Sequence, residues 1–369
     1  MEKQASLQNK NTWLFSRNTD IFLLLFPVWL CWLVSFLLPQ SVLQKALPLW
    51  FWAVFILGID VSHVWSTIFR TYLDKDEFSR HKSLLVYAPL LSFTIFFALA
   101  SISQIWFWRV LAYLALYHFI KQQYGFLALY QLKRGKNLHT KILNDKWVIY
   151  FSMLYPVAYW HISGNRVFNW FVQNDFINIG SQITTYAQQL NIHYWLILFA
   201  WLLEEWKLAK RQLSQIQTGK VLWVLTTANN WYLGIVYFNS DIVFSLTNVV
   251  AHGIPYMVLV LYYVEKKIQR RAVNKPSTVK RRGINIAFML LLILFLAFGE
   301  EYLWDMLLYR EKQPLFESLL HYPIQAAQNP FFQAIVLAAL SIPQVSHYII
   351  DGYIWKGKKN PYVKKVFTN

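Results

Sequence analysis

Apolar runs of about twenty residues recur along the chain and alternate with short polar connections. About 20 apolar residues in an α-helix cross the hydrocarbon core of a bilayer, so runs of this length predict membrane-spanning helices. The first run, Ile21 to Leu38, is too long for a signal-peptide core and lacks a small-residue cleavage site, so we expect it to be retained. The predicted spans lie near residues 21–38, 47–69, 83–104, 105–130, 147–163, 187–206, 220–238, 241–264, 284–299 and 330–354.

The composition agrees with this pattern. Of the 369 residues, 56% are hydrophobic and 18% are aromatic, and the mean hydropathy is positive. A soluble protein cannot bury so many long apolar runs. The chain is therefore predicted to be all-α, a polytopic membrane bundle of about ten transmembrane helices in a single integral membrane domain, 1–369. The outer connection 300–329 is rich in aromatic residues and leucine, which is typical of a short interfacial helix.

The net charge of +17 follows the predicted topology. If the N-terminus is cytoplasmic, 30 of the 35 lysines and arginines fall on the inner side, because only five lie outside. This asymmetry is the positive-inside rule, and it predicts that both termini are cytoplasmic, in the inner membrane if the protein is bacterial. We expect the basic loops to contact anionic headgroups and expect no nucleic-acid partner. The five outer residues are Lys45, Arg109, Arg166, Arg310 and Lys312.

A single cysteine, Cys31, lies in the first predicted span. One cysteine forms no intrachain disulfide and offers no dithiol for quinone chemistry. It also excludes a structural zinc site built on several thiolates.

Four histidines lie inside predicted spans, each on a different helix. An ionisable side chain in hydrocarbon costs roughly 2.5–3.5 kcal/mol on insertion scales when charged, so such a residue is a functional candidate by default. Counted at 1.5 Å per residue, all four lie roughly 10–22 Å from the cytoplasmic ends of their spans. We therefore expect them to share one layer, in the inner half of the bilayer. They are His63, His118, His252 and His347.

Two of these histidines have a carboxylate one helical turn away. Asp60 precedes His63 by three residues, and Asp351 follows His347 by four. Residues at these spacings share one face of a helix. Each aspartate is predicted either to bind a metal ion or to orient the imidazole from behind.

The other two histidines have polar neighbours of a different kind. Lys121 and Gln122 follow His118 by three and four residues, and Asn248 precedes His252 by four. Pro255 follows His252 closely and lacks a backbone donor, so the helix is expected to loosen there. A freed carbonyl group is tolerated in a membrane only where protein or water satisfies it.

This donor set predicts a transition-metal site. Neutral imidazole suits zinc, iron, copper or nickel, and added carboxylate favours non-haem iron, in one ion or two. The four histidines would hold the metal, with Asp60 and Asp351 as ligands or orienting groups. Asn248, Gln122 and Gln344 would line the pocket, while Lys121 or Arg70 would hold a headgroup or an acid group. The predicted function is oxidation of a lipid or isoprenoid that enters from the bilayer, and it leaves room for a redox partner.

The pattern resembles polytopic multi-histidine membrane oxygenases, such as the Brp/Blh-type carotenoid-cleaving enzymes and the membrane fatty-acid hydroxylases and desaturases. The resemblance rests on histidines and aspartates dispersed over several spans. The sequence lacks the HxxxH and HxxHH boxes of the desaturases and hydroxylases, and it lacks the close histidine pair of the carotenoid-cleaving enzymes. The resemblance implies metal-dependent oxidation of a hydrophobic substrate, and no residue role is carried over from it.

Three other functions remain open on the sequence alone. A proton-coupled transporter would use histidine and aspartate as a relay, but it needs access from both faces, and the outer half is predicted to hold few charged groups. A membrane lipid acyltransferase would need one histidine as general base with a partner such as Asn248. A haem protein would use two histidines as axial ligands.

Overall fold

The structure is a computed structural model that describes residues 12–45, 47–134, 143–164, 166–179, 184–211, 216–273, 282–319, 329–356 and 360–368. In these ranges all regular structure is helical and no strand occurs. The predicted all-α fold class is therefore confirmed. Two segments of the basic loops expected to contact headgroups, 135–142 and 274–281, lie outside the described residues.

Six helical segments of the described chain are long and apolar enough to cross a membrane. They support the prediction of a multi-pass membrane protein. Four further helical segments, α9, α10, α11 and α12 with η5, do not meet the same standard of length and apolarity. The six are Arg17–Leu37, Leu49–Arg70, Lys82–Ile102, Asp241–Gln269, Ile286–Tyr309 and Pro330–Ile354. The four are α9 (Gln104–Arg134), α10 (Asp145–Ile162), α11 (Thr184–Lys210) and α12 (Thr218–Trp231) with η5 (Tyr232–Tyr237).

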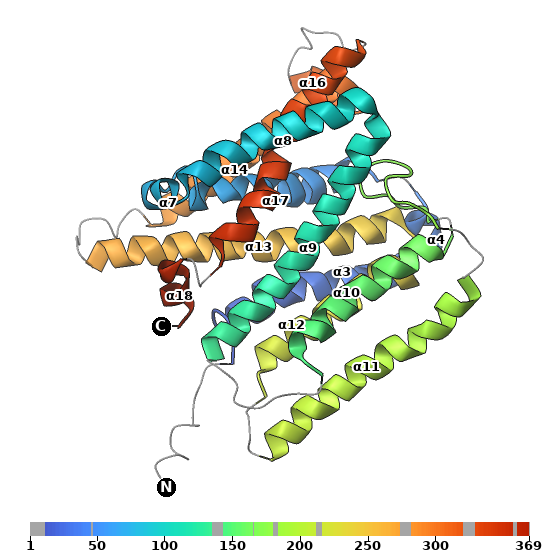
Figure 1. The fold of residues 1–369 in the computed structure, drawn as a ribbon, viewed down its shortest axis with the longest axis vertical. Helices are drawn as coiled ribbons and strands as arrows, with labels where there is room; N and C mark the ends of the chain where they lie inside the picture. Colours follow the sequence, from blue (N-terminus) through green and yellow to red (C-terminus); the bar gives the residue numbers. More distant parts are fainter. Residues whose placement is uncertain are drawn as a thin grey trace.

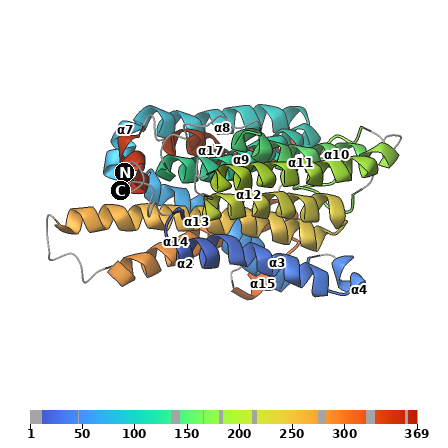
Figure 2. The ribbon, with the colours of Figure 1, turned by 90° about the horizontal axis from the view of Figure 1, so that it is seen from below.

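Helix α13 (Asp241–Val273) runs through the middle of the bundle (Figure 1). Seen from below, it lies between a layer with α8 (Lys82–Ile102) and α17 (Ile342–Ile354) and a layer with α3 (Phe26–Leu37) and α14 (Figure 2). The buried share of its apolar window, 78%, is the largest among the six candidate spans. Side chains on α13 are therefore placed to meet partners from several other helices.

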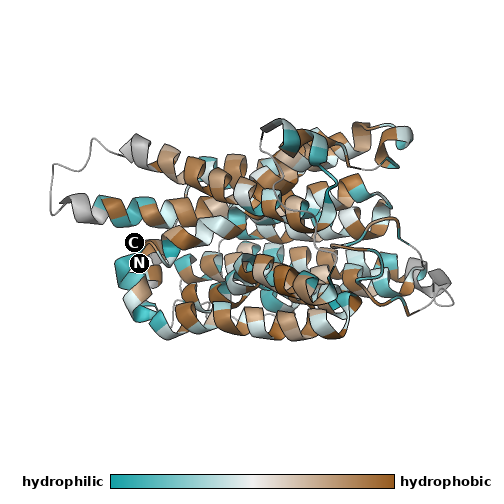
Figure 3. Ribbon diagram, turned by 90° about the horizontal axis from the view of Figure 1, so that it is seen from above, coloured by the Kyte–Doolittle hydropathy of each residue, from teal (hydrophilic) through white to brown (hydrophobic). Residues whose placement is uncertain are grey.

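The outer surface of the bundle is apolar. Hydrophobic residues cover most of the helix lengths, and many hydrophilic residues gather near the helix ends (Figure 3). Large apolar side chains such as Leu37, Ile102 and Phe295 are at least 70% exposed. An exposed apolar surface of this extent is expected where the solvent is lipid.

The second candidate span changes its helical form three times. It begins as α5 (Leu49–Phe51) and continues as a ten-residue π-helix, η2 (Trp52–Val61). It then becomes α6 (Ser62–Ser66) and ends in a 3₁₀ turn, η3 (Thr67–Arg70). Departures from α geometry within a helix often occur at functional sites. Here they bracket His63 on both sides.

Helix α14 (Arg282–Trp304) continues through η7 (Asp305–Tyr309), beyond the predicted end of its span at residue 299. The first residues of the predicted outer loop 300–329 are thus helical. Their carboxylates have partners in the bundle: Trp65 Nε1 donates to Glu300 at 2.7 Å and Trp52 Nε1 donates to Glu301 at 3.1 Å.

The rest of this outer connection is described only in part. It holds a short helix, α15 (Gln313–Leu319), whose Phe316 is fully buried. Residues 320–328, in which the prediction also placed the outer loop, lie outside the described residues.

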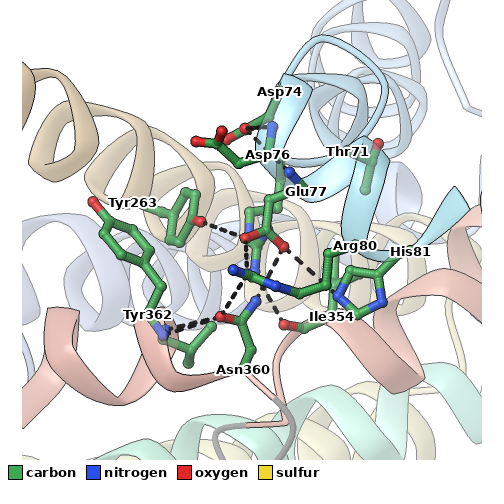
Figure 4. Close-up of polar contacts among 12 residues, drawn as sticks. Thr71, Asp74, Asp76, Glu77, Arg80, His81, Tyr263, Ile354, Asn360 and Tyr362 are labelled. Carbon is green, nitrogen blue, oxygen red and sulfur yellow. Dashed lines mark hydrogen bonds and ion pairs between the residues drawn. The ribbon is translucent and has the colours of Figure 1, made fainter.

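A buried ionic cluster links the second span to the C-terminal segment. Arg70 and Glu77 form an ion pair at 2.6 Å, and both side chains are at most 1% exposed. Figure 4 shows Glu77 contacting Asn360 and Tyr263 as well. Burial lowers the pKa of His81, which also lies beside Glu77, so Arg70 and Arg80 supply the balancing charge. Because Arg70 is enclosed in this way, it is not open to the headgroup role expected from the sequence.

Candidate metal centre

The structure brings the four predicted histidines together. They come from α6, α9, α13 and α17, and every one is buried. Each offers one ring nitrogen, and these four nitrogens all lie within 4.8 Å of one another. Among the described residues this is the one such group of potential ligands. Its members are His63, His118, His252 and His347.

The spacing of the rings suits one shared ion. His63 Nε2 and His252 Nε2 are 3.1 Å apart, and the ring centres of His118 and His347 are 4.6 Å apart. Two nitrogens that each lie 2.0–2.1 Å from one metal ion are separated by roughly 3 Å. No large movement is therefore needed to bring this pair into a coordination sphere.

The hydrogen bonding of the rings also indicates a missing partner. Each of the four histidines has a fully buried ring nitrogen without a hydrogen-bond partner. Leaving such a group unsatisfied costs about 1–3 kcal/mol. Such a cost on each of four neighbouring rings is hard to reconcile with a purely structural cluster, whereas a metal ion would accept one lone pair from each ring. The four atoms are His63 Nδ1, His118 Nε2, His252 Nδ1 and His347 Nε2, and of these His63 Nδ1 faces Asp60 instead of the other rings.

A chain of hydroxyl groups orients His347. Its Nδ1 lies 2.7 Å from Thr67 Oγ1, which lies 2.9 Å from the hydroxyl of Tyr256. Tyr256 donates in turn to Asp351 Oδ1 at 2.6 Å. If every proton points toward the carboxylate, His347 donates through Nδ1, which leaves the Nε2 lone pair directed at the cluster. This assignment follows from the hydrogen-bond network.

Asp60 stands behind His63 in a similar way. Its Oδ1 is 3.5 Å from His63 Nδ1, and its side chain is 29% exposed. His63 Nε2 faces His252 on the opposite edge of the ring. Asp60 can thus accept a proton from Nδ1 after a small movement, and it remains open to the neighbouring cavity.

The two aspartates do not belong to the group of close ligand atoms, which contains histidines alone. Asp351 Oδ1 lies 3.9 Å from His347 Nδ1, the nitrogen that faces away from the cluster. Of the two roles that the sequence left open for Asp60 and Asp351, the geometry fits orientation of the rings better than ligation. The sequence fixes only that aspartate and histidine share a helix face. Which ring edge the carboxylate meets depends on side-chain rotation.

A close helix contact places His252. A Cβ atom added at Gly253 would lie 2.6 Å from Ile59 Cγ2 and 3.1 Å from the Ile59 carbonyl oxygen. Glycine therefore allows α13 to touch the π-helix η2 next to the cluster. The ring of His252 stacks on Phe119, with 3.6 Å between ring centres and an interplanar angle of 5°.

The carbonyl groups near Pro255 are satisfied by glutamines. Pro255 lies inside α13, which continues through it, and its missing N–H frees the carbonyl of Ala251. Gln123 Nε2 donates to this carbonyl at 3.1 Å, and Gln122 Nε2 donates to the His252 carbonyl at 2.8 Å. Gln122 thus supports the backbone of α13 and is not among the residues that line the adjoining pocket.

Two further predicted site residues, Lys121 and Asn248, differ in their surroundings. Lys121 is exposed on α9, where it donates to the Tyr150 hydroxyl at 3.2 Å and lies over the ring of Tyr124. It turns away from the cluster because a residue three positions after His118 is rotated by about 60° around the helix. Asn248 is buried, donates to the Phe244 carbonyl at 2.8 Å and lines the pocket beside the cluster.

Sequence reasoning missed two tyrosines at the site. Tyr256 follows His252 by four residues, so its spacing carried a signal, and its hydroxyl connects Thr67 to Asp351. Tyr348 stacks on His118 with 4.6 Å between ring centres. Tyr348 gave no such signal, because a residue adjacent to His347 is expected on a different face.

A pocket of about 360 Å³ adjoins the cluster. Asp60, Asn248 and Tyr348 are among its lining residues, and Gln344 lines it as predicted, donating to the Tyr348 hydroxyl at 2.7 Å. This volume lies within the usual range for small-molecule sites.

The chain matches no protein-family model, no curated protein and no solved structure.

Proposed function

We propose that the protein is a metal-dependent membrane oxidoreductase whose four histidines hold one transition-metal ion, non-haem iron. The observation that carries the proposal is the group of four buried histidines that offer one ring nitrogen each, all within 4.8 Å of one another. Iron is among the metals that neutral imidazole suits. Bound there, it would supply redox chemistry with dioxygen toward a lipid, isoprenoid or other hydrophobic small molecule.

The remaining residues would prepare and enclose this centre. The hydroxyl chain from His347 to Asp351 would hold the ring nitrogen toward the metal and raise its basicity. Asp60 would likewise orient the ring of His63 and raise its basicity. It would also exchange protons with groups or water in the pocket. Aromatic rings such as Phe119 and Tyr348 would keep bulk water from the ion. Electrons would come from a redox partner.

The crowding of the rings argues against haem. A macrocycle between two axial histidines needs a wide flat gap on every side of the iron. The rings of His63, His118 and His347 instead approach one another with centres 4.6–5.0 Å apart. The same crowding favours one ion over two.

Metal analysis of the purified protein tests the proposal. We expect near-stoichiometric transition metal by mass spectrometry, and a fall of roughly tenfold or more in His63→Ala and His347→Ala because each loses a ligand. His193→Ala is the matched control, since this histidine is exposed and lies on α11. Folded wild-type protein without bound metal, also after supply of iron, zinc, copper or nickel salts, would refute the metal centre.

One observation favours a second candidate, a proton-coupled transporter. The outer half was expected to hold few charged groups, but Asp60 and Glu300 line the pocket on one side of the histidines. The hydroxyl chain leads from His347 to Asp351 on another side. Such an arrangement would serve as a proton relay. Proton uptake by proteoliposomes that depends on His347, without bound metal, would favour transport.

We also propose ten spans, cytoplasmic termini and, in a bacterium, location in the inner membrane. The distribution of lysine and arginine supports this topology, and it would place the histidines in the inner half of the bilayer. Anionic headgroups would contact the basic face. Reporter fusions after residues 140 and 275 should report the cytoplasm, and fusions after residues 175 and 325 the outer side. The opposite pattern of reporter signals would contradict the proposed topology and place both termini on the outer side.

A further inference from the structure

The pocket beside the histidine cluster has an unusual lining for a space within a membrane bundle. Among the described residues that line it are five carboxyl groups and one lysine. They extend from Asp60, at the cluster, to Glu311 and Lys312 in the connection after α14. The carboxyl residues are Asp60, Glu300, Glu301, Asp305 and Glu311.

The innermost carboxyl groups have no cationic side chain as partner. Among the described residues, neither Asp60 nor Glu300 forms an ion pair with lysine or arginine. Asp60 lies against His63 Nδ1, and Glu300 accepts from the indole of Trp65. Carboxylates that are largely withdrawn from water are usually paired with a positive charge or bound to a cation, and Asp60 and Glu300 are both half-buried. The interior of this pocket is therefore short of positive charge.

Aromatic rings form the walls around these carboxyl groups. Trp108 lies 6.1 Å from Trp304 and 5.6 Å from Phe171 by ring centres, and all three line the pocket. Tyr348 closes the wall next to His118. At the edge of the pocket, Lys312 Nζ lies 4.9 Å from the ring centre of Trp52, so one cation–π contact is already present there.

We propose that this pocket binds the positively charged nitrogen group of an amphiphilic substrate, a quaternary ammonium or amine, and holds it beside the histidine cluster. The aromatic faces attract an organic cation through their quadrupoles, and the carboxylates supply the opposite charge. The volume and position of the pocket fit this ligand. About 360 Å³ is enough for such a headgroup, and Asp60 both lines the pocket and lies beside His63. The inference names a substrate class for the proposed oxidoreductase and thus rests on that function.

An organic cation fits the lining better than a divalent metal ion. A calcium or magnesium site needs several oxygen ligands at 2.0–2.6 Å around one point. Among the described residues, these carboxyl groups do not form a group of close ligand atoms, whereas the histidines do. Tryptophan faces would also contribute nothing to a hydrated metal ion.

The test compares two soluble probes of nearly equal shape. Choline carries a trimethylammonium group, and 3,3-dimethyl-1-butanol replaces its nitrogen by carbon without charge. We expect saturable binding of choline to the purified protein by calorimetry and at least roughly tenfold weaker binding of the alcohol. Glu300→Gln keeps an acceptor for Trp65 and should weaken choline binding by a similar factor. Glu317→Gln, an exposed carboxylate outside the pocket lining, is the matched control.

Four results would overturn the inference. These are the absence of choline binding, equal binding of the two probes, choline binding that Glu300→Gln leaves unchanged, and displacement of choline by calcium at a lower concentration than by tetramethylammonium. Metal content is measured on the same samples, so the two proposals fail separately. Metal-free protein that binds choline would support the pocket inference and refute the oxidoreductase. Metal-loaded protein that does not bind choline would support the oxidoreductase and refute the pocket inference.

Discussion

At the residue scale, the site depends on which edge of each imidazole faces the centre. His63 presents Nε2 to His252, and its Nδ1 faces Asp60. His347 directs Nδ1 to Thr67 and thereby leaves Nε2 for the cluster. A hydrogen bond to one ring nitrogen fixes the tautomer and orientation of the other. The groups behind the rings should therefore control metal affinity.

Thr67→Val removes the hydroxyl that joins His347 to Tyr256 and keeps the branched shape of the side chain. We expect metal affinity to fall about 10–100-fold, because the ring loses the partner that orients it. Competition with a chelator measures this change. Thr94→Val is the matched control, since Thr94 is an exposed threonine whose hydroxyl bonds only its own helix, at Leu90. Unchanged affinity in Thr67→Val would mean that the hydroxyl chain does not serve the metal.

The sequence could predict the four histidines but not their surroundings. Two arguments identified the four histidines: the free-energy cost of placing an ionisable side chain in hydrocarbon, and their similar depth in the membrane. Both arguments need only the position of a residue along its span. The contact of Lys121 with Tyr150 was not predictable, because spacing gives the angle between two residues but not the rotation of the helix against its neighbours. The pocket carboxylate Glu300 was assigned to a loop, because indole donors from another helix are invisible in the sequence.

At the element scale, the contact between α13 and η2 sets the distance between His252 and His63. Gly253 meets Ile59 at this crossing without room for a methyl group. Small residues allow close approach of helix backbones in membranes. The ten-residue π-helix just before His63 alters the rotation of the second span, which no hydropathy pattern reveals.

Gly253→Ala should separate these two elements. The added Cβ would lie 2.6 Å from Ile59 Cγ2, so we expect a destabilisation of about 1–3 kcal/mol and loss of metal binding. Thermal unfolding in detergent and metal analysis measure the two effects. Gly299→Ala, on α14, has no neighbouring atom within 4 Å of its added Cβ and should behave as wild type. Equal melting temperatures and metal contents in both variants would contradict the close-packing argument.

Gln123→Leu tests how α13 tolerates Pro255. The change leaves the carbonyl of Ala251 without its side-chain donor and removes the acceptor of the Thr227 hydroxyl. Unsatisfied buried groups of this kind cost about 1–3 kcal/mol each. We expect a lower melting temperature than in Gln104→Leu, whose glutamine is on the same helix but makes an exposed hydrogen bond, to Gln333. If the two variants melt alike, water rather than Gln123 satisfies the carbonyl.

At the scale of the whole molecule, the histidine cluster lies between the pocket and the buried ionic cluster of Arg70 and Glu77. The pocket reaches the histidines from the side of Lys312, and the ionic cluster of Arg70 and Glu77 lies beyond the opposite ends of the same helices. Arg70 follows Thr67 by three residues and donates to the carbonyl of Ile354, three residues after Asp351. The cluster thus ties together the helix ends that carry the groups behind His347.

This arrangement predicts that Glu77→Gln affects both stability and the metal centre. Arg70 would keep its buried charge without a carboxylate, and breaking a buried pair typically costs about 3–5 kcal/mol. The ends of η3 and α17 would then separate, so metal retention should fall together with the melting temperature. Glu311→Gln breaks an exposed pair with Lys312 and should change neither. A Glu77→Gln protein with wild-type melting and full metal content would show that the cluster is not needed to hold these helices together.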